Sequence, residues 1–119
     1  MALTKNHPLT EHVLYAYSSS LGTSPIVAYA RAPFRGKITK VGVIQNGAVT
    51  GTSTVTTAIN GTSITGGAVS VTAGSAGSLF TASPTAANTV AEDDVVSFTP
   101  AGATGTVTGQ CFAVIVRTA

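Results

Sequence analysis

The fold is decided by the stretch Thr52–Thr65, TSTVTTAINGTSIT, in which Asn60-Gly61 separates two β-branched runs. A type I′ turn needs two central residues that tolerate positive φ, and Asn-Gly meets this need best. Such a turn pairs Ile59 with Thr62 and Thr57 with Ile64. Strand alternation then gives an apolar face of Val55, Ile59 and Ile64, and an opposite face of Thr54, Thr56, Ala58 and Ser63. We therefore predict a β-hairpin whose register agrees with its hydrophobic pattern.

The rest of the chain has the same sequence pattern. Short β-branched runs bounded by Gly, Asn, Pro and Ser recur, and helical periodicity is nearly absent. We predict strands at His12–Tyr17, Ile26–Arg31, Lys37–Ile44, Thr52–Ile59, Thr62–Thr65, Ala68–Thr72, Asp94–Thr99 and Gln110–Arg117. The segments Asn88–Asp94 and Pro100–Gly109 have the composition of loops. About eight short strands in 119 residues predict an all-β protein, a jelly-roll-like antiparallel β-sandwich with one modest core.

The chain divides in composition near residue 25. Residues 26–119 are expected to form the β-sandwich domain. Residues 1–25 hold two of the three tyrosines and both histidines, and we expect them to form an extended N-terminal arm with the first strand. Such an arm is flexible alone and becomes ordered on docking.

Two strands carry unusual apolar patterns. Ile38 and Val41 are three residues apart, so both can face inward only if an extra residue is inserted, and we predict a β-bulge near Lys40. The last strand is apolar on both faces, since Phe112, Val114 and Val116 alternate with Cys111, Ala113 and Ile115. A strand of this kind lies between two layers or has its outer face covered by another subunit.

Charge is scarce, since only 8% of residues are charged and none lies between Val41 and Ala91, whereas about a quarter is usual. Uncharged faces dock without desolvating ions, so this composition suits a protein held in a fixed assembly. Ten charged side chains are too few for the basic stripe that binds nucleic acid, and direct nucleic-acid contact is not expected. No membrane span and no secretion signal are expected either.

The sequence offers little for catalysis. Both histidines fall in the expected arm, and no serine-hydrolase elbow, Walker loop or dinucleotide fingerprint occurs. Cys111 lies in an apolar run and is expected to be an inert buried thiol. Glu92-Asp93-Asp94 is interpreted as a strand-entry turn, with a weak calcium site or an intersubunit ion pair as alternatives. We expect a protein that is not an enzyme and has no cofactor or metal.

A basic cluster is the clearest candidate for a contact with a partner. Arg31, Arg35, Lys37 and Lys40 lie within ten residues around Phe34, where they could meet an acidic surface. The alternative is an ordinary solvated strand edge, at which the cations prevent unwanted pairing with strands of other molecules.

Three segments together resemble the head decoration, or cement, proteins of tailed bacteriophages. They are Arg31–Ile38 (RAPFRGKI), Ala58–Gly67 (AINGTSITGG) and Val90–Val96 (VAEDDVV), and the likeness covers roughly residues 26–117. Asp93 stands where the family pattern would have Gly, but Asp tolerates left-handed geometry, so the turn can survive.

The resemblance implies a β-sandwich that binds the outer surface of a mature capsid and bridges neighbouring copies of the major capsid protein. It implies a virion location, with assembly in the host bacterial cytoplasm, and no catalytic residues. A homo-oligomer is expected, with a dimer favoured and a trimer possible. The candidate capsid or intersubunit interface consists of Leu9, Val13, Tyr15, Tyr17, Arg31, Phe34, Arg35 and Lys37.

The role of the arm is inferred from its composition, since the resemblance does not extend to it. We expect deletion of residues 1–24 to abolish capsid binding and to leave a folded domain. Two other classes of protein share the composition. A phage fibre or head-surface module that binds host glycans would also be rich in Thr and Gly, but it usually displays exposed aromatic residues. A pilus or surface-layer subunit would need an export signal.

Overall fold

The computed structural model describes residues 11–72 and 74–118. These residues form an antiparallel β-sandwich without a helix, which confirms the predicted all-β class. The strands are β1 (Glu11–Ser18), β2 (Ala28–Arg31), β3 (Gly36–Gln45), β4 (Ser53–Ile59), β5 (Thr62–Val71), β6 (Leu79–Ala82), β7 (Thr89–Val90), β8 (Val95–Ala101) and β9 (Gly109–Arg117).

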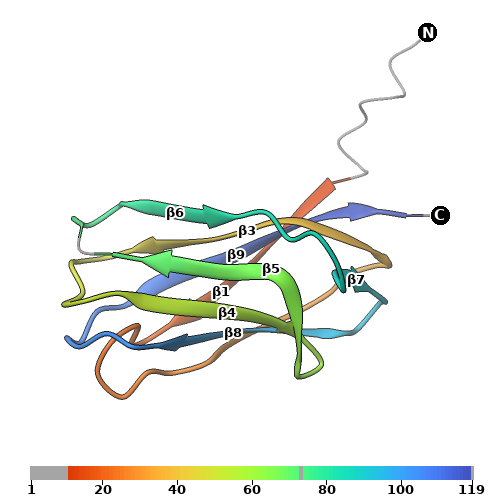
Figure 1. The fold of residues 1–119 in the computed structure, drawn as a ribbon. Coiled ribbons are helices and arrows are strands. Elements are labelled where there is room, and N and C mark those ends of the chain that lie inside the picture. Colours follow the sequence, from red (N-terminus) through yellow and green to blue (C-terminus); the bar gives the residue numbers. More distant parts are fainter. Residues whose placement is uncertain (1–10, 73, 119) are drawn as a thin grey trace, which may run out of the picture.

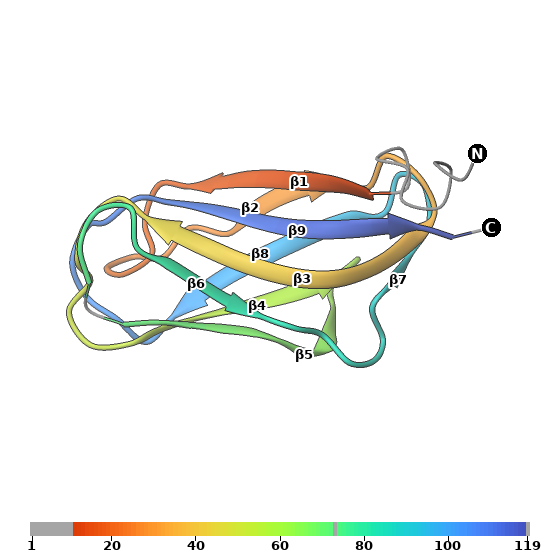
Figure 2. The same cartoon turned by 90° about the horizontal axis from the view of Figure 1, so that it is seen from above.

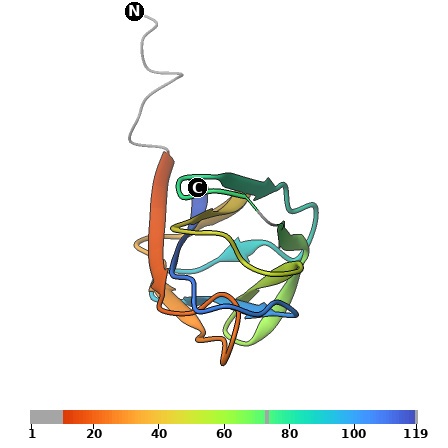
Figure 3. The ribbon, with the colours of Figure 1, turned by 90° about the vertical axis from the view of Figure 1, so that its left-hand side faces the viewer.

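Two sheets pack face to face (Figures 1 and 3). One sheet has the order β1-β9-β3-β6, with β7 paired to the start of β3, and the other has the order β2-β8-β4-β5. The chain crosses between the sheets after β1, β2, β3, β5, β7 and β8. This order and these crossings give a jelly-roll arrangement, in which β7 is a short fifth strand of the first sheet.

The core lies between the layers and consists mainly of valine, isoleucine and alanine, with Phe98 as its largest fully buried side chain. Ile38 and Val41 are both completely buried. The pairing of β3 with β9 shifts register between Ile38 and Lys40, which confirms the predicted bulge. The extra residue at this point turns both side chains inward and leaves Lys40 exposed on the other side.

The Asn60-Gly61 hairpin forms with φ of 49° and 88° at the two turn residues, and Ile59 pairs with Thr62 as predicted. The predicted Thr57–Ile64 pair is wrong, because Thr57 lies opposite the whole segment Ile64–Gly67. This wide bulge lets Ile64 fold over Gly67, where an added Cβ would lie 2.3 Å from Ile64 Cγ1.

The predicted faces of this hairpin are largely retained. Val55 and Ile64 are buried and Thr54 and Ser63 are exposed. Ala58 is buried as well, because β4 is a central strand and this small side chain lies between β5 and β8.

The segment from Glu11 to Pro25 differs from the expected arm. Strand β1 pairs with β9 over its full length of eight residues, and Leu21, in the connector that follows, is completely buried. The Leu21 backbone N–H donates to Val107 O at 2.7 Å, and its carbonyl accepts from Ser53 Oγ at 2.7 Å. Residues 11–25 are therefore part of the sandwich, so a chain truncated at residue 24 loses a sheet edge and a core residue.

Other element boundaries also differ from the prediction. The predicted strands Thr62–Thr65 and Ala68–Thr72 are one bulged strand, β5. The predicted loop Asn88–Asp94 contains the two-residue strand β7, held by Asn88 Nδ2 donating to Ile38 O at 2.6 Å. Strand β6 was not predicted, because its four residues lack a clear alternating pattern.

Candidate docking surface

Charge in the described residues is concentrated toward one end of the sandwich. Strand β1 begins there, β2 and β9 end there, and the turn between β7 and β8 lies there (Figure 1). All nine charged side chains of the described residues lie on these elements, on the connection between β2 and β3, or on the first half of β3. They are Glu11, Arg31, Arg35, Lys37, Lys40, Glu92, Asp93, Asp94 and Arg117. The loops at the opposite end carry no charge.

Four cations at this end and along the first half of β3 are here called the basic end: Arg35, Lys37, Lys40 and Arg117. Strand pairing brings Arg117 beside the start of β3, because Gly36 pairs with Arg117 and Lys37 with Val116. Lys37 points to the same side of the sheet as Val116, whereas Arg117 points to the opposite side. All four side chains are exposed, and within the described part of the chain none forms an ion pair. Arg31 is different, because its Nε binds Asp93 Oδ1 at 2.5 Å.

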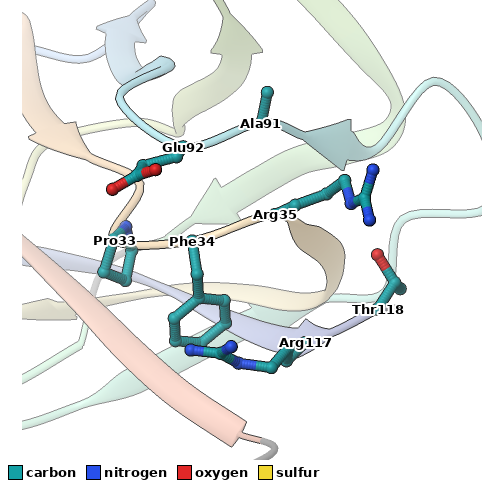
Figure 4. Close-up of a pocket in the computed structure, with 7 residues that line it drawn as sticks. All are labelled: Pro33, Phe34, Arg35, Ala91, Glu92, Arg117 and Thr118. Carbon is teal, nitrogen blue, oxygen red and sulfur yellow. The ribbon is translucent and has the colours of Figure 1, made fainter.

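A shallow pocket of about 520 Å³ opens at the basic end (Figure 4). It is lined by Pro33, Phe34, Arg35, Ala91, Glu92, Arg117 and Thr118. The Arg117 guanidinium lies over the Phe34 ring, with its carbon 4.5 Å from the ring centroid. The His12 ring meets Phe34 edge-on at 6.1 Å. Phe34 therefore holds the Arg117 cation in place by a cation–π contact, and the edge of the guanidinium remains available to an anion.

The acidic cluster beside this pocket forms the turn that leads into β8, as interpreted from the sequence. Asp93 adopts a φ of 72°, the left-handed geometry that the Asp at this position was expected to tolerate. The Ala91 N–H and the Asn60 side-chain amide both donate to the Asp94 carboxylate, and these bonds lower the pKa of Asp94 below its ordinary value of 3.8. Asp93 and Asp94 are thus occupied in structural bonds.

The second candidate surface is the outer face, the side of the β1-β9-β3-β6 sheet that points away from the core (Figure 2). Cross-strand register arranges its side chains in rows. The row near the basic end is Glu11, Val116 and Lys37; the next is Val13, Val114 and Lys40; the third is Tyr15, Phe112 and Gly42; the fourth is Tyr17, Gln110 and Ile44.

The middle of this outer face is largely apolar and accessible, and its charged residues lie in the two rows near the basic end. Tyr15 and Tyr17 are 61% and 58% exposed, and Val114 and Phe112 at its centre are only half-buried. The Phe112 ring lies across Gly42, where an added Cβ would be 2.4 Å from the ring, and it contacts Tyr15 at 6.3 Å between centroids. The outer face is therefore a flat aromatic and aliphatic surface of the kind found at protein interfaces.

Metal-ligating and nucleophilic side chains are few in residues 11–72 and 74–118. Within them no group of three or more His, Cys, Asp or Glu side chains could hold a metal ion. Cys111 is completely buried, as expected, and burial raises the pKa of its thiol to about 12. The same residues contain no helix with the length and hydropathy of a membrane span.

The predicted interface residues separate into two groups. Val13, Tyr15 and Tyr17 lie on the outer face, whereas Arg31, Phe34, Arg35 and Lys37 lie at the charged end. Leu9 lies outside the described residues. Lys37 belongs to both surfaces, so the two meet at the start of β3.

Sequence reasoning missed Arg117 as a site residue and did not give Phe112 and Val114 a named role. Arg117 is more than seventy positions from the other cations, and only the pairing of β3 with β9 brings it to them. The apolar alternation of the last strand was the signal for Phe112 and Val114.

No protein-family model matches the chain, and no curated protein matches it.

Proposed function

We propose that this protein is a non-catalytic structural protein of a phage virion. It binds the outer surface of the capsid and cements neighbouring major capsid protein subunits. The observation that carries this proposal is the concentration of charge at one end, where four exposed cations have no acidic partner in the described residues. The segment resemblance and the jelly-roll fold support it, although a fold alone does not specify a function.

The basic end is the proposed contact with the capsid, and an acidic patch on the capsid subunit is the matching surface. Exposed cations steer a partner into register and raise the rate of encounter, and salt screens this effect. Each contact can be weak, because many copies on one rigid shell act together. Cementing then follows mechanically, since a protein that straddles a seam adds buried area that must be lost before the seam opens.

The test is cosedimentation of the purified protein with undecorated expanded heads. We expect saturable binding at a fixed stoichiometry, weaker at high salt, and increased resistance of the decorated heads to heat. The double variant Arg35→Glu/Arg117→Glu should weaken binding about tenfold or more, since reversing interface charges is costly.

Arg31→Ala provides the matched control, because Arg31 is already paired with Asp93 and should be nearly silent. Binding that is absent, or that is equally insensitive to all these substitutions and to salt, would contradict the proposed contact.

A glycan-binding surface module is the second candidate, and the exposure of Tyr15 and Tyr17 favours it. These side chains are two residues apart on one strand, so their Cα atoms are about 7 Å apart on the same face. Exposed aromatic rings on a flat sheet can stack on sugar rings. A glycan array distinguishes the two functions: specific binding that is lost in Tyr15→Ala/Tyr17→Ala would favour the glycan module.

A further inference from the structure

We infer that the outer face binds the outer face of a second copy of this chain, about a two-fold axis that runs along β9. The side chains of this face are accessible to a partner. Phe112 and Val114, at the centre of a sheet, are half-buried and flanked by the exposed Tyr15 and Tyr17. Exposed apolar patches of this kind often mark sites of protein interaction.

The register shows why a second copy fits. Strand β9 lies between β1 and β3, and each row has one residue on each of the three strands. A two-fold axis along β9, in the plane between two facing copies, brings every β1 position opposite the β3 position of the same row. The β9 side chains then meet their own counterparts, as an isologous interface requires.

The charges are complementary in this arrangement. Glu11, the only acidic residue among the described outer-face residues, shares its row with Lys37. The axis therefore places Glu11 of each copy opposite Lys37 of the other, twice per dimer. Packed sheets cross at about 30°, and both side chains are long enough to meet across this twist.

The aromatic row fits in the same way. Tyr15 faces Gly42 of the second copy, a position that has no side chain and is covered by the edge of the Phe112 ring. Tyr15 of one copy can thus pack against Phe112 of the other. Aromatic pairs of this kind add about 0.5–1.5 kcal/mol beyond the area that they bury.

The size of the face sets the expected affinity. Three strands about 4.8 Å apart, each eight residues long at about 3.3 Å per residue, span roughly 14 by 26 Å. This is about 360 Å² per copy, which is below the area of a stable interface and in the range of weak, transient contacts, so we expect a reversible dimer with Kd in the high micromolar range or above.

The dimer has one consequence for capsid binding, and this consequence rests on the proposed function. An axis parallel to β9 leaves the direction of the strands unchanged, so both basic ends lie at the same end of the pair. Two capsid-binding surfaces would then point toward one shell, and each could bind a different subunit across a seam. The dimer itself is argued from this chain alone.

The test measures the purified protein without capsid, so its result is separate from that of the cosedimentation test. Sedimentation equilibrium over a wide concentration range should show reversible dimers. Val114→Lys should remain monomeric, whereas Val95→Lys, on the other sheet and 42% exposed, should dimerise like the parent. A parent protein that is monomeric at all concentrations would overturn the inference.

Charge reversal tests the orientation. Glu11→Lys and Lys37→Glu should each weaken dimerisation several-fold, and the double variant should restore it. Val114→Cys should be crosslinked into a dimer by a short bis-maleimide reagent that spans about 10 Å, the distance between packed sheets, since Val114 lies at the axis. Val95→Cys should not be crosslinked. Failure of the double variant to recover, or equal crosslinking of the two cysteine variants, would exclude this arrangement.

Discussion

Leu21 offers a quantitative test of whether the N-terminal segment belongs to the folding unit. This side chain is completely buried and packs onto Gly109, where an added Cβ would lie 2.5 Å from Leu21 Cδ1. Replacing Leu21 by Ala removes its buried methyl groups and leaves a cavity. Substitutions of this kind in cores cost about 2–5 kcal/mol.

The expected shift in melting temperature follows from the chain length. Unfolding entropy near 60 °C is about 2.1 cal/mol/K per residue, or about 0.25 kcal/mol/K for this chain, so a loss of about 3 kcal/mol lowers Tm by about 12 °C. Differential scanning calorimetry and urea unfolding would measure the change. Both should show one cooperative transition in the variant.

Leu79→Ala is the matched control, because the same substitution is made at a leucine that is 57% exposed. A change within about 0.5 kcal/mol is expected there. If Leu21→Ala cost no more than Leu79→Ala, the connector after β1 would not be part of the core, and the separate arm expected from sequence would be the better description.

Three further predictions concern single buried or turn positions. Thr57→Val should raise the free energy of unfolding by about 1–2 kcal/mol in urea titrations, because Thr57 Oγ1 is buried and has no hydrogen-bond partner among the described residues. A loss of stability would show that the hydroxyl is satisfied. Asn60→Gly keeps the positive φ but removes the side-chain bonds to Asp94 and to Val95 N, so Tm should fall. The lowered pKa of Asp94 stabilises the fold above pH 3.8, and this contribution is lost as pH falls through the folded-state pKa. Acid titrations should therefore show a smaller loss of folding stability with falling pH in Asn60→Gly than in the parent protein. Cys111 should resist thiol reagents in the native state, and rapid labelling of the native protein would contradict its burial. Because burial raises the pKa of its thiol, the contribution of Cys111 to the free energy of unfolding is fully present below pH 9.0 and decreases as pH rises toward 12. Cys111→Ala should make this decrease smaller.

Local chemistry made much of the sandwich predictable. Asn60-Gly61 specifies its turn through backbone φ, and the three-residue spacing of Ile38 and Val41 specifies the bulge through the period of two of a strand. Each of these signals comes from residues that are near neighbours in the sequence. The position of β1 beside β9 depends instead on a contact between the two ends of the chain, and no local pattern reports it.

The same distinction applies to the candidate site. The basic cluster around Phe34 was visible as neighbours in sequence, but Arg117 joins it only through the pairing of β3 with β9. The bulge opposite Thr57 was hidden for a related reason. Thr65 leaves the hairpin to pair with Ala86, a contact with a loop that the two-strand pattern cannot include.

Electron cryomicroscopy of expanded heads saturated with the protein tests the central claim most directly, because it shows which end of the sandwich meets the shell. We predict density for the protein at a fixed set of positions on the capsid exterior. Arg35 and Arg117 should face acidic side chains of the major capsid protein, Lys37 and Lys40 should lie on the face between the two copies of the dimer, and the uncharged loops should point outward. Heads without such density, or with the uncharged loop end against the shell, would contradict this account.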